Sequence, residues 1–341
     1  MKKALHLYVC KFKKNSGDFF LGPSTKYHFE QTISKDIQWS NFDIRKTVNK
    51  KDVEYFNKFD YIVVGGGGLL LPDSNRNNIS CWQWPISADL INKIKVPIYV
   101  LSIGLNWFFG QNAAMPVNDS LNKDKRRIPI FKNNIETLIS KSSHFSMRHK
   151  GDILQLNSFV NLKNKNKIKF EFCPVINYVK SKYRIESEGD LFTFELKDDR
   201  PKMRYVGTSR EEVYSKLFSF MKILDNNNKK IGIMSHDGSS SFKRYVDKKG
   251  FKNYVFLDNS VANEKKIIDN YRKVKKLYCS AGHSQMTSYA LGIDSYTLIS
   301  HPKLKYFIQD TGRSIPKDGN FVKDISIEGL IVSSGLSGRY L

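Results

Sequence analysis

The sequence contains few of the residues that build metal centres and disulfide frameworks. Among 341 residues it has four cysteines, which are far apart and form no Cys-x-x-Cys pair: Cys10, Cys81, Cys173 and Cys279. Four histidines also lack the spacing of metal ligands: His28, His144, His149 and His301. We therefore expect neither a disulfide framework nor a metal site. Cys10 and Cys279 lie in strand-like runs and are predicted to be buried thiols.

Long hydrophobic runs are missing as well. No apolar stretch approaches the ~18–20 residues that a membrane-spanning helix needs. Residues 1–10 are basic and then apolar, without the long apolar region and small-residue cleavage site of a signal peptide. We expect them to form the first strand of a cytoplasmic protein. The composition, 40% hydrophobic and 26% charged, is that of a globular chain long enough for two domains.

Acidic residues are in short supply. The chain has 33 Asp and Glu residues against 56 Lys and Arg residues, which gives a net charge of +23. This charge favours phosphorylated substrates, polyanions or peripheral contact with an anionic surface such as the inner membrane. The densest basic run, residues 161–169, has none of the interleaved aromatics that stack on nucleic-acid bases. We predict a solvated linker there and no binding of nucleic acid.

The glycine pattern matches neither of the common nucleotide-binding fingerprints. Four consecutive glycines, Gly65–Gly68, follow the apolar run 61–64 and fit neither G-x-G-x-x-G nor G-x-x-x-x-G-K-[ST]. The run 61–64 predicts a buried strand. A strand that ends in glycines is where α/β proteins often bind an anion, because the ligand can approach the backbone closely. A tight turn without a ligand is the alternative.

Strand-like and helix-like segments alternate along the chain. The expected strands are 5–10, 61–64, 98–103, 144–147, 192–196, 231–235, 254–257, 277–280 and 295–299. This alternation predicts parallel sheets with helices on both faces. We therefore expect an α/β protein with two Rossmann-like domains facing a cleft. The N-terminal domain, residues 1–165, holds the glycine run, and the C-terminal domain comprises residues 166–341.

Two strand-to-helix junctions in the second domain carry polar side chains. The run 231–235 opens into a loop with His236 and Asp237, and the run 277–280 leads to Gly282 and His283. Ligands of α/β proteins bind beyond the carboxyl ends of parallel strands. Both loops are therefore expected to open on the cleft between the domains.

Taken in order, these motifs resemble those of the polysaccharide pyruvyltransferase family over most of the chain. The matching elements are Asn15-Ser-Gly-Asp18, the Asp-x-x-x-x-Gly-Gly-Gly segment from Phe59 to Leu71, the Ser-Ile-Gly ending at Gly104, Ser146-Met-Arg148, Gly151-Asp152, Cys173-Pro174 in place of Asp-Pro, and finally His283, Gly292 and Lys303. Each piece alone would be weak, but the ordered set is fairly specific.

The resemblance implies a GT-B-like fold and a transferase of exopolysaccharide biosynthesis in the cell envelope. Such an enzyme moves a pyruvyl group from phosphoenolpyruvate to a sugar of a cell-surface polysaccharide or its lipid-linked precursor, forming a ketal. It needs no cofactor besides this donor substrate. The first domain would bind the glycan acceptor and the second domain the donor.

One position departs from the family pattern. Ala281 stands two residues before His283, where the family commonly has the arginine of an Arg-x-His motif. That arginine would be a natural clamp for an anion. Its absence keeps open a second hypothesis, a GT-B glycosyltransferase that uses a nucleotide-sugar donor in surface-glycan synthesis. A non-catalytic protein of polysaccharide assembly is the third.

Ketal formation suggests the catalytic residues. One sugar hydroxyl attacks C2 of phosphoenolpyruvate while C3 is protonated, and a second hydroxyl then displaces phosphate. We assign His283 as the general acid, because histidine titrates near neutral pH. Asp18 could orient or deprotonate an acceptor hydroxyl.

The same chemistry requires residues that bind an anionic donor. Arg148 and Lys303 are assigned to this task, with Lys305 as the substitute for Lys303 if the register slips by two. His236 and Asp237 are weaker candidates for substrate contact. Backbone amides add partial positive charge, and those expected to contribute belong to Gly65, Gly66, Gly67 and Gly68.

Each assignment has a structural alternative. His283 could cap a helix, Arg148 could be an ion-pair partner, and Lys303 could simply begin a helix. Asp18 suits an N-cap and Asp237 suits a turn. The aromatic group Trp82, Trp84, Trp107, Phe108 and Phe109 could stack on a sugar or contact a membrane, but we predict that it packs in the core.

Overall fold

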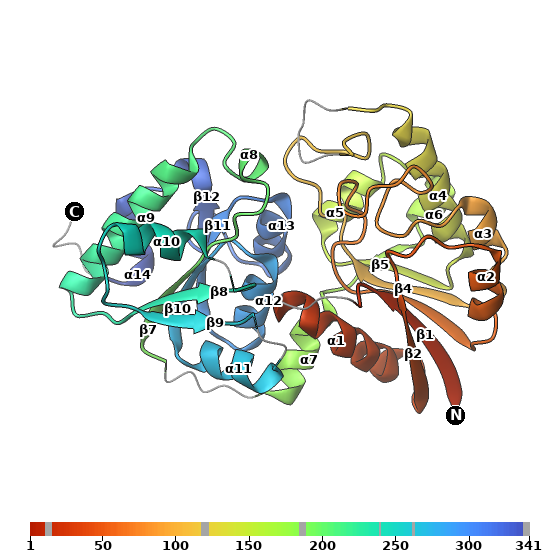
Figure 1. Cartoon of the computed structure of the whole chain (residues 1–341), viewed down its shortest axis with the longest axis horizontal. Coiled ribbons are helices and arrows are strands. Elements are labelled where there is room, and N and C mark those ends of the chain that lie inside the picture. Colours follow the sequence, from red (N-terminus) through yellow and green to blue (C-terminus); the bar gives the residue numbers. More distant parts are fainter. Residues whose placement is uncertain (11–15, 117–122, 184–188, 239, 261–262, 337–341) are drawn as a thin grey trace. The chain divides into compact units, whose positions relative to one another are not determined.

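The chain divides into two compact units in the computed structural model, which describes residues 1–10, 16–116, 123–183, 189–238, 240–260 and 263–336 (Figure 1). Unit 1 comprises Met1–Phe12 and Leu21–Tyr178, and unit 2 comprises Lys13–Phe20 and Val179–Leu341. This division differs from the expected boundary between residues 165 and 166. The reason is that the strand Ile168–Phe170 joins the sheet of unit 1.

Unit 1 is built on a six-stranded parallel sheet in the order β2-β1-β3-β4-β5-β6. Its strands are β1 (Lys2–Tyr8), β2 (Ile37–Asp43), β3 (Tyr61–Gly65), β4 (Ile98–Ile103), β5 (His144–Met147) and β6 (Ile168–Phe170). The helices are α1 (Ser16–Thr32), α2 (Lys50–Phe56), α3 (Ala88–Asn92), α4 (Arg127–Lys141), α5 (Lys150–Leu156), α6 (Leu162–Lys165) and α7 (Pro174–Lys182). Helix α1 has its first residues in unit 2, and α7 has its last residues there.

Apolar side chains cover both faces of this sheet. Val64 of β3 points into a large cluster with residues of α2, α3 and α4, whereas Val63 points to the opposite face. There it meets Phe29 of α1 and Leu101 of β4. Successive strand residues alternate between faces, so the apolar run 61–64 buries side chains on both.

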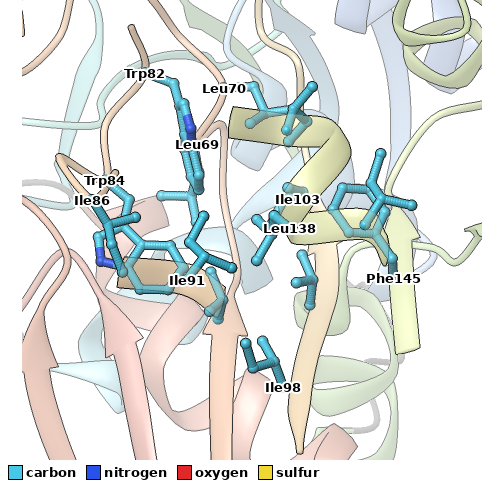
Figure 2. Packing of buried hydrophobic residues seen from close by; sticks show 14 of the residues in the cluster. Leu69, Leu70, Trp82, Trp84, Ile86, Ile91, Ile98, Ile103, Leu138 and Phe145 are labelled. Carbon is cyan, nitrogen blue, oxygen red and sulfur yellow. The ribbon is translucent and has the colours of Figure 1, made fainter. Parts of the chain in front are cut away.

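Most of the aromatic group lies in the core, as predicted. The buried members are Trp82, Trp84, Trp107 and Phe108. Figure 2 shows Trp82 and Trp84 among leucine and isoleucine side chains, and the Trp82 indole donates a 2.7 Å hydrogen bond to Oδ1 of Asn134. Phe109 is the exception, with 39% of its surface exposed.

Unit 2 has a second six-stranded parallel sheet, in the order β12-β11-β10-β7-β8-β9. Its strands are β7 (Leu191–Glu195), β8 (Ile231–Ser235), β9 (Val255–Asp258), β10 (Val274–Cys279), β11 (Asp294–Ile299) and β12 (Gly319–Phe321). The helices are α8 (Pro201–Arg204), α9 (Arg210–Asn226), α10 (Ser241–Lys248), α11 (Glu264–Arg272), α12 (Gly282–Ala290), α13 (Pro302–Asp310) and α14 (Ile327–Ser334). Figure 1 shows helices on both faces of this sheet.

The core of unit 2 is strongly aromatic. Phe194 of β7 stacks on Tyr278 of β10 with ring centroids 5.1 Å apart, and Phe220 of α9 packs against both rings. Stacked and edge-to-face ring pairs add to the stabilisation that their buried area provides. These contacts hold the two central strands of the sheet, β7 and β10, together. Polar residues follow the carboxyl ends of both strands.

Both sheets have a topological switch point. In unit 1 the chain passes from β1 to β2 on one side and returns to β3 on the other side of β1. In unit 2 it passes from β7 to β8 and β9, and then crosses to β10 on the opposite side of β7. The crevice beyond the strand ends at such a point is the usual ligand site of an open α/β sheet.

Candidate functional site

The glycine run lies at the switch point of unit 1. Gly65 ends β3, and its carbonyl oxygen lies 3.0 Å from Nε2 of the buried His6 of β1. Burial lowers the pKa of His6 to about 3, so this imidazole is neutral. The end of β3 is thereby tied to the neighbouring strand across the switch point.

Gly66 and Gly67 adopt conformations that other residues avoid. Their φ angles are 66° and 92°, and a Cβ atom on Gly66 would lie 2.8 Å from Oγ1 of Thr25 on α1. A Cβ on Gly68 would lie 2.6 Å from Cγ of Asn106. Close packing alone therefore demands glycines here, which supports the tight-turn alternative without excluding a ligand.

Arg148 follows β5 and reaches the same loop. Its side chain lies over Gly104, where an added Cβ would come within 2.5 Å of Nε and 2.8 Å of Cζ. Gly104 in turn donates its backbone N–H to the carbonyl oxygen of Gly67 at 2.8 Å. Nη2 of Arg148 donates to Oδ1 of Asn106 at 3.3 Å. The structure thus brings together the glycine run and the predicted arginine within unit 1.

The charge of Arg148 is poorly compensated by the protein. The side chain is 3% exposed, and Nε has no hydrogen-bond partner among the described residues. At the position where the resembling family has the Asp of Asp-Pro, this chain has Cys173. Burial raises the pKa of the Cys173 thiol, and the charge of Arg148 acts in the opposite direction. A buried guanidinium is costly without an anionic partner. An anionic ligand would supply one.

In unit 2, His236 holds the start of α1. Nδ1 of His236 lies 2.9 Å from Oγ of Ser16, and the backbone N–H of Gly17 donates to Nε2 at 3.2 Å. Burial lowers the pKa of His236 to about 3, with the charge of Lys197 acting in the same direction. A neutral ring that accepts at Nε2 carries its proton at Nδ1. His236 is therefore engaged with the protein backbone, which favours a positioning role for this predicted substrate contact.

His283 packs directly against Gly17. It is the second residue of α12, and a Cβ on Gly17 would lie 2.0 Å from Nδ1 of His283. The rings of His236 and His283 lie nearly parallel, with centroids 6.1 Å apart. The Ser-Gly-Asp motif near the N-terminus thus has a packing reason, because any side chain at position 17 would displace His283. Asn15, which begins that motif, lies outside the described residues.

Lys303 lies beside the start of α12. A Cβ on Gly282 would be 3.1 Å from Cε of Lys303 and 3.8 Å from Nζ. Lys305 points elsewhere, with Nζ 6.0 Å from the centroid of the Phe321 ring. Of the two lysines, Lys303 is therefore the one beside the first turn of α12, and its assignment to donor binding stays a prediction.

The two candidate aspartates differ from their expected settings. Asp18 is the third residue of α1, which begins at Ser16, so it lies inside the helix rather than at the N-cap. It lies in the first helical turn, where an acidic side chain is stabilised by the helix dipole. Asp237 forms an ion pair with Lys197, the second residue after β7. That pair joins the loops that follow β7 and β8.

Glu195 is a residue of this site that the sequence reasoning missed. It ends β7, it is 1% exposed, and its Oε2 atom has no hydrogen-bond partner among the described residues. Burial raises its pKa to about 7, and Asp237 acts in the same direction. The sequence showed only a glutamate within the expected strand 192–196, and its burial becomes evident only in the folded sheet.

Other features of the described residues concern metals, thiols and membranes. No group of three or more His, Cys, Asp or Glu side chains in the described part of the chain could hold a metal ion. All four cysteines are free thiols; Cys279 is buried as predicted, and Cys10 is partly exposed. Among the described helices, none combines the length and the hydrophobicity that crossing a bilayer requires.

Comparison with known proteins identifies the fold. No protein-family model matches the sequence, and no curated protein sequence matches it. Among solved structures, UDP-GlcNAc 2-epimerase from Methanocaldococcus jannaschii matches with a TM-score of 0.56 at 15% identity, over 100% of this chain and 94% of that chain. The S. aureus MnaA–UDP co-structure has a TM-score of 0.55 at 10% identity, over 98% and 87%. UDP-GlcNAc 2-epimerase from Neisseria meningitidis bound to UDP-GlcNAc has 0.52 at 10%, over 98% and 90%.

Similarity at this level of identity establishes the fold alone. The expected fold class is confirmed: the chain is an α/β protein with two Rossmann-like units of the GT-B-like type. Gly65–Gly68 and Arg148 belong to unit 1, whereas the other candidates belong to unit 2: Asp18, His236, Asp237, His283 and Lys303. That both groups face one cleft stays a prediction.

Proposed function

We propose that this protein is a GT-B-type transferase of surface-glycan synthesis that uses a nucleotide-sugar donor. The observation that carries the proposal is the cluster of Gly17, Gly282, His283 and Lys303 beyond the switch point of unit 2. Gly17 lets the start of α1 pack against His283, and Gly282 lets the side chain of Lys303 lie beside the first turn of α12, so that an ammonium group is next to the amides of that turn. Backbone amides at a helix start together with a lysine suit a phosphate-bearing ligand.

The ligands of two similar structures support the choice of nucleotide. One of those proteins was solved with UDP and another with UDP-GlcNAc. We infer that unit 2 takes the donor as a uridine diphosphate sugar and that a glycan or lipid-linked sugar is the acceptor. The net charge of +23 favours both an anionic donor and an acceptor that carries phosphate.

Thermal-shift titration with UDP and UDP-GlcNAc tests this proposal. A ligand at 100 times its Kd stabilises the protein by about 2.7 kcal/mol, which is measurable as a rise in Tm. Lys303→Met should weaken UDP binding about ten- to hundredfold, because a charge-assisted phosphate contact contributes roughly 1.5–3 kcal/mol. Lys305→Met is the matched control, since that lysine lies against Phe321 instead, and it should bind UDP as the wild type does.

A second candidate function is favoured by one specific observation in unit 1. Arg148 is a buried guanidinium without an anionic partner among the described residues, and it lies beside the glycine run. Together with the family resemblance, it supports pyruvyl transfer from phosphoenolpyruvate, with His283 as the general acid. In that case Arg148 would bind the carboxylate or phosphate of the donor bidentately.

The two candidates predict different ligands and different sensitive residues. If the protein is a pyruvyltransferase, phosphoenolpyruvate raises the Tm, UDP does not, and Arg148→Met abolishes the shift. If it uses a nucleotide sugar, UDP raises the Tm and Lys303→Met reduces the shift at the same UDP concentration. A protein that binds neither donor but binds glycan would refute both proposals and leave a non-catalytic role.

A further inference from the structure

Glu195 occupies the central position at the switch point of unit 2. It lies opposite Cys279 at the end of β10, and its carbonyl oxygen accepts a 3.0 Å hydrogen bond from the N–H of Ser280. The backbone N–H of Lys197 in turn donates to Oγ of Ser280 at 2.7 Å. The segment that follows Glu195 is therefore tied in two directions. Lys197 pairs with Asp237 in the loop after β8, and the hydrogen bonds with Ser280 join it to the loop that leads into α12.

The carboxyl group of Glu195 touches the start of α12. It is fully buried, and the backbone amide of Ala281, the N-cap residue of α12, hydrogen-bonds to it. Its Oε2 atom has no partner among the described residues. Since no donor or acceptor is committed to that oxygen, the carboxyl group can gain a proton without breaking a hydrogen bond. The same helix start carries the cluster to which we assign the phosphate-bearing ligand.

Charged and titratable groups surround Glu195 from several elements. Positive charge comes from Lys197, which follows β7, and from Arg204 of α8. Negative charge comes from Asp237, which follows β8. Two further groups interact with it electrostatically, Tyr271 of α11 and Cys279 of β10. Burial is the largest influence and raises the pKa of Glu195 to about 7, so the free protein holds a mixture of both protonation states near neutral pH.

We propose that Glu195 is the group at which unit 2 takes up a proton when an anion binds at the start of α12. A bound anion repels the buried carboxylate, and protonation from solvent removes that repulsion. Binding and protonation are then thermodynamically linked, so anion affinity falls as the pH rises. The inference rests on the proposed ligand site in unit 2, but it does not depend on which donor the enzyme uses.

Calorimetric titration with inorganic sulfate tests the proposal, because sulfate keeps its charge throughout the pH range of interest. Titrations in two buffers of different ionisation enthalpy give the number of protons taken up per sulfate bound. The wild type should take up a fraction of one proton at about pH 8, and its affinity should fall by up to about tenfold per pH unit above the pKa. The variant Glu195→Gln, which is neutral and of similar shape, should take up none and show a flat pH profile.

An exposed glutamate supplies the matched control. Glu211 of α9 has a side chain that is 67% exposed and pairs with Arg210 at the surface, so Glu211→Gln should keep the proton uptake of the wild type. Infrared difference spectra of the wild type, with and without sulfate, provide a measurement that needs no variant. Sulfate should increase the absorption of a protonated carboxyl group.

Each outcome decides the matter. Proton uptake that persists in Glu195→Gln, or sulfate binding without proton uptake, would overturn the inference, and so would an absence of sulfate binding to the wild type. If sulfate binds with Glu195-dependent uptake while neither UDP nor phosphoenolpyruvate binds, the inference stands and the proposed function fails.

Discussion

Replacing Gly17 by alanine is the sharpest test of how the unit 2 site is assembled. The new Cβ would lie 2.0, 2.4 and 2.6 Å from Nδ1, Cγ and Cβ of His283. Real Cβ atoms essentially never come closer than 3.0 Å to such neighbours. The imidazole or the first turn of α1 must therefore move by about 1 Å, which is the difference between 3.0 and 2.0 Å.

The expected cost follows from two opposing effects. Overpacking of this kind costs roughly 1–3 kcal/mol, while alanine gains about 1 kcal/mol over glycine in a helix. The free energy of unfolding should therefore fall by about 1 kcal/mol, which corresponds to a fall in Tm of roughly 2–4 °C. The free energy of anion binding at the start of α12 should fall by more than this, because the displaced group is His283 itself.

A double-mutant cycle with His283→Gly isolates the contact. Removing the imidazole and its Cβ removes all three close approaches to position 17. In the His283→Gly background, Gly17→Ala should therefore be neutral or stabilising. The change in unfolding free energy of the double variant should differ from the sum of the two single-variant changes by more than about 1 kcal/mol. Chemical denaturation of the four proteins measures this coupling. Additive costs would show that Gly17 and His283 are not in contact, and the account of the site would fail.

Three further predictions concern unit 1. Glu171 interacts with His144 across 2.9 Å, and although burial acts to raise the pKa of Glu171, hydrogen bonds from His144 and other groups lower it overall. The contribution of Glu171 to stability is therefore present above the unfolded-state pKa of about 4.3 and is lost as the pH falls from there toward the lower folded-state pKa. Glu171→Gln should lower the Tm at neutral pH and flatten the dependence of the Tm on pH in acid. Arg127 is 1% exposed and donates to several backbone carbonyls. Arg127→Met leaves those acceptors buried without donors, so urea denaturation should show that the free energy of unfolding falls by about 3 kcal/mol or more. A fall of less than about 1 kcal/mol would contradict this. Asn134→Ala should lower the free energy of unfolding by about 1–3 kcal/mol, because it leaves the buried indole N–H of Trp82 without its acceptor. The fluorescence of Trp82 should change as well.

The sequence predicted the central strands better than the edges of the sheets. Strands β3, β4, β8 and β10 are apolar runs, and their positions agree with expectation to within a few residues. The missed strands, β2, β6 and β12, all lie at sheet edges. Edge strands face solvent and need no continuous apolar run; β2, for example, reads Ile-Gln-Trp-Ser-Asn-Phe-Asp. Their pairing is decided by the neighbouring strand, which no local pattern reveals.

Helix α1 shows how a local rule can mislead. Gly17, Gly22 and Pro23 suggest a helix that starts after them, yet α1 begins at Ser16 and contains all three. The glycines are required by tertiary packing: Gly17 faces His283, and a Cβ on Gly22 would lie 3.0 Å from the Tyr8 ring. Contacts with distant residues thus overrode the intrinsic preference for a break.

The roles of the candidate site residues stay predictions. The family resemblance and the chemistry of an anionic donor suggested Arg148, His283 and Lys303, and the structure places each beside a glycine that lets it pack closely. The role of His236 could not be read from the sequence, since its partners Ser16 and Gly17 lie about 220 residues away. The importance of Glu195 depends on burial and strand order, and both are properties of the folded sheet rather than of any short motif.

The assignment of residues 13–20 to unit 2 has a consequence for how the protein is made. These residues leave the ribosome well before His283, against which Gly17 packs and which follows much later in the sequence. Domains usually fold in order of synthesis, but here the N-terminal segment must wait until α12 exists. A fragment comprising residues 179–341 would expose the imidazole face that Gly17 covers. Dividing the gene at the apparent domain boundary would therefore yield a C-terminal protein with an unfinished site.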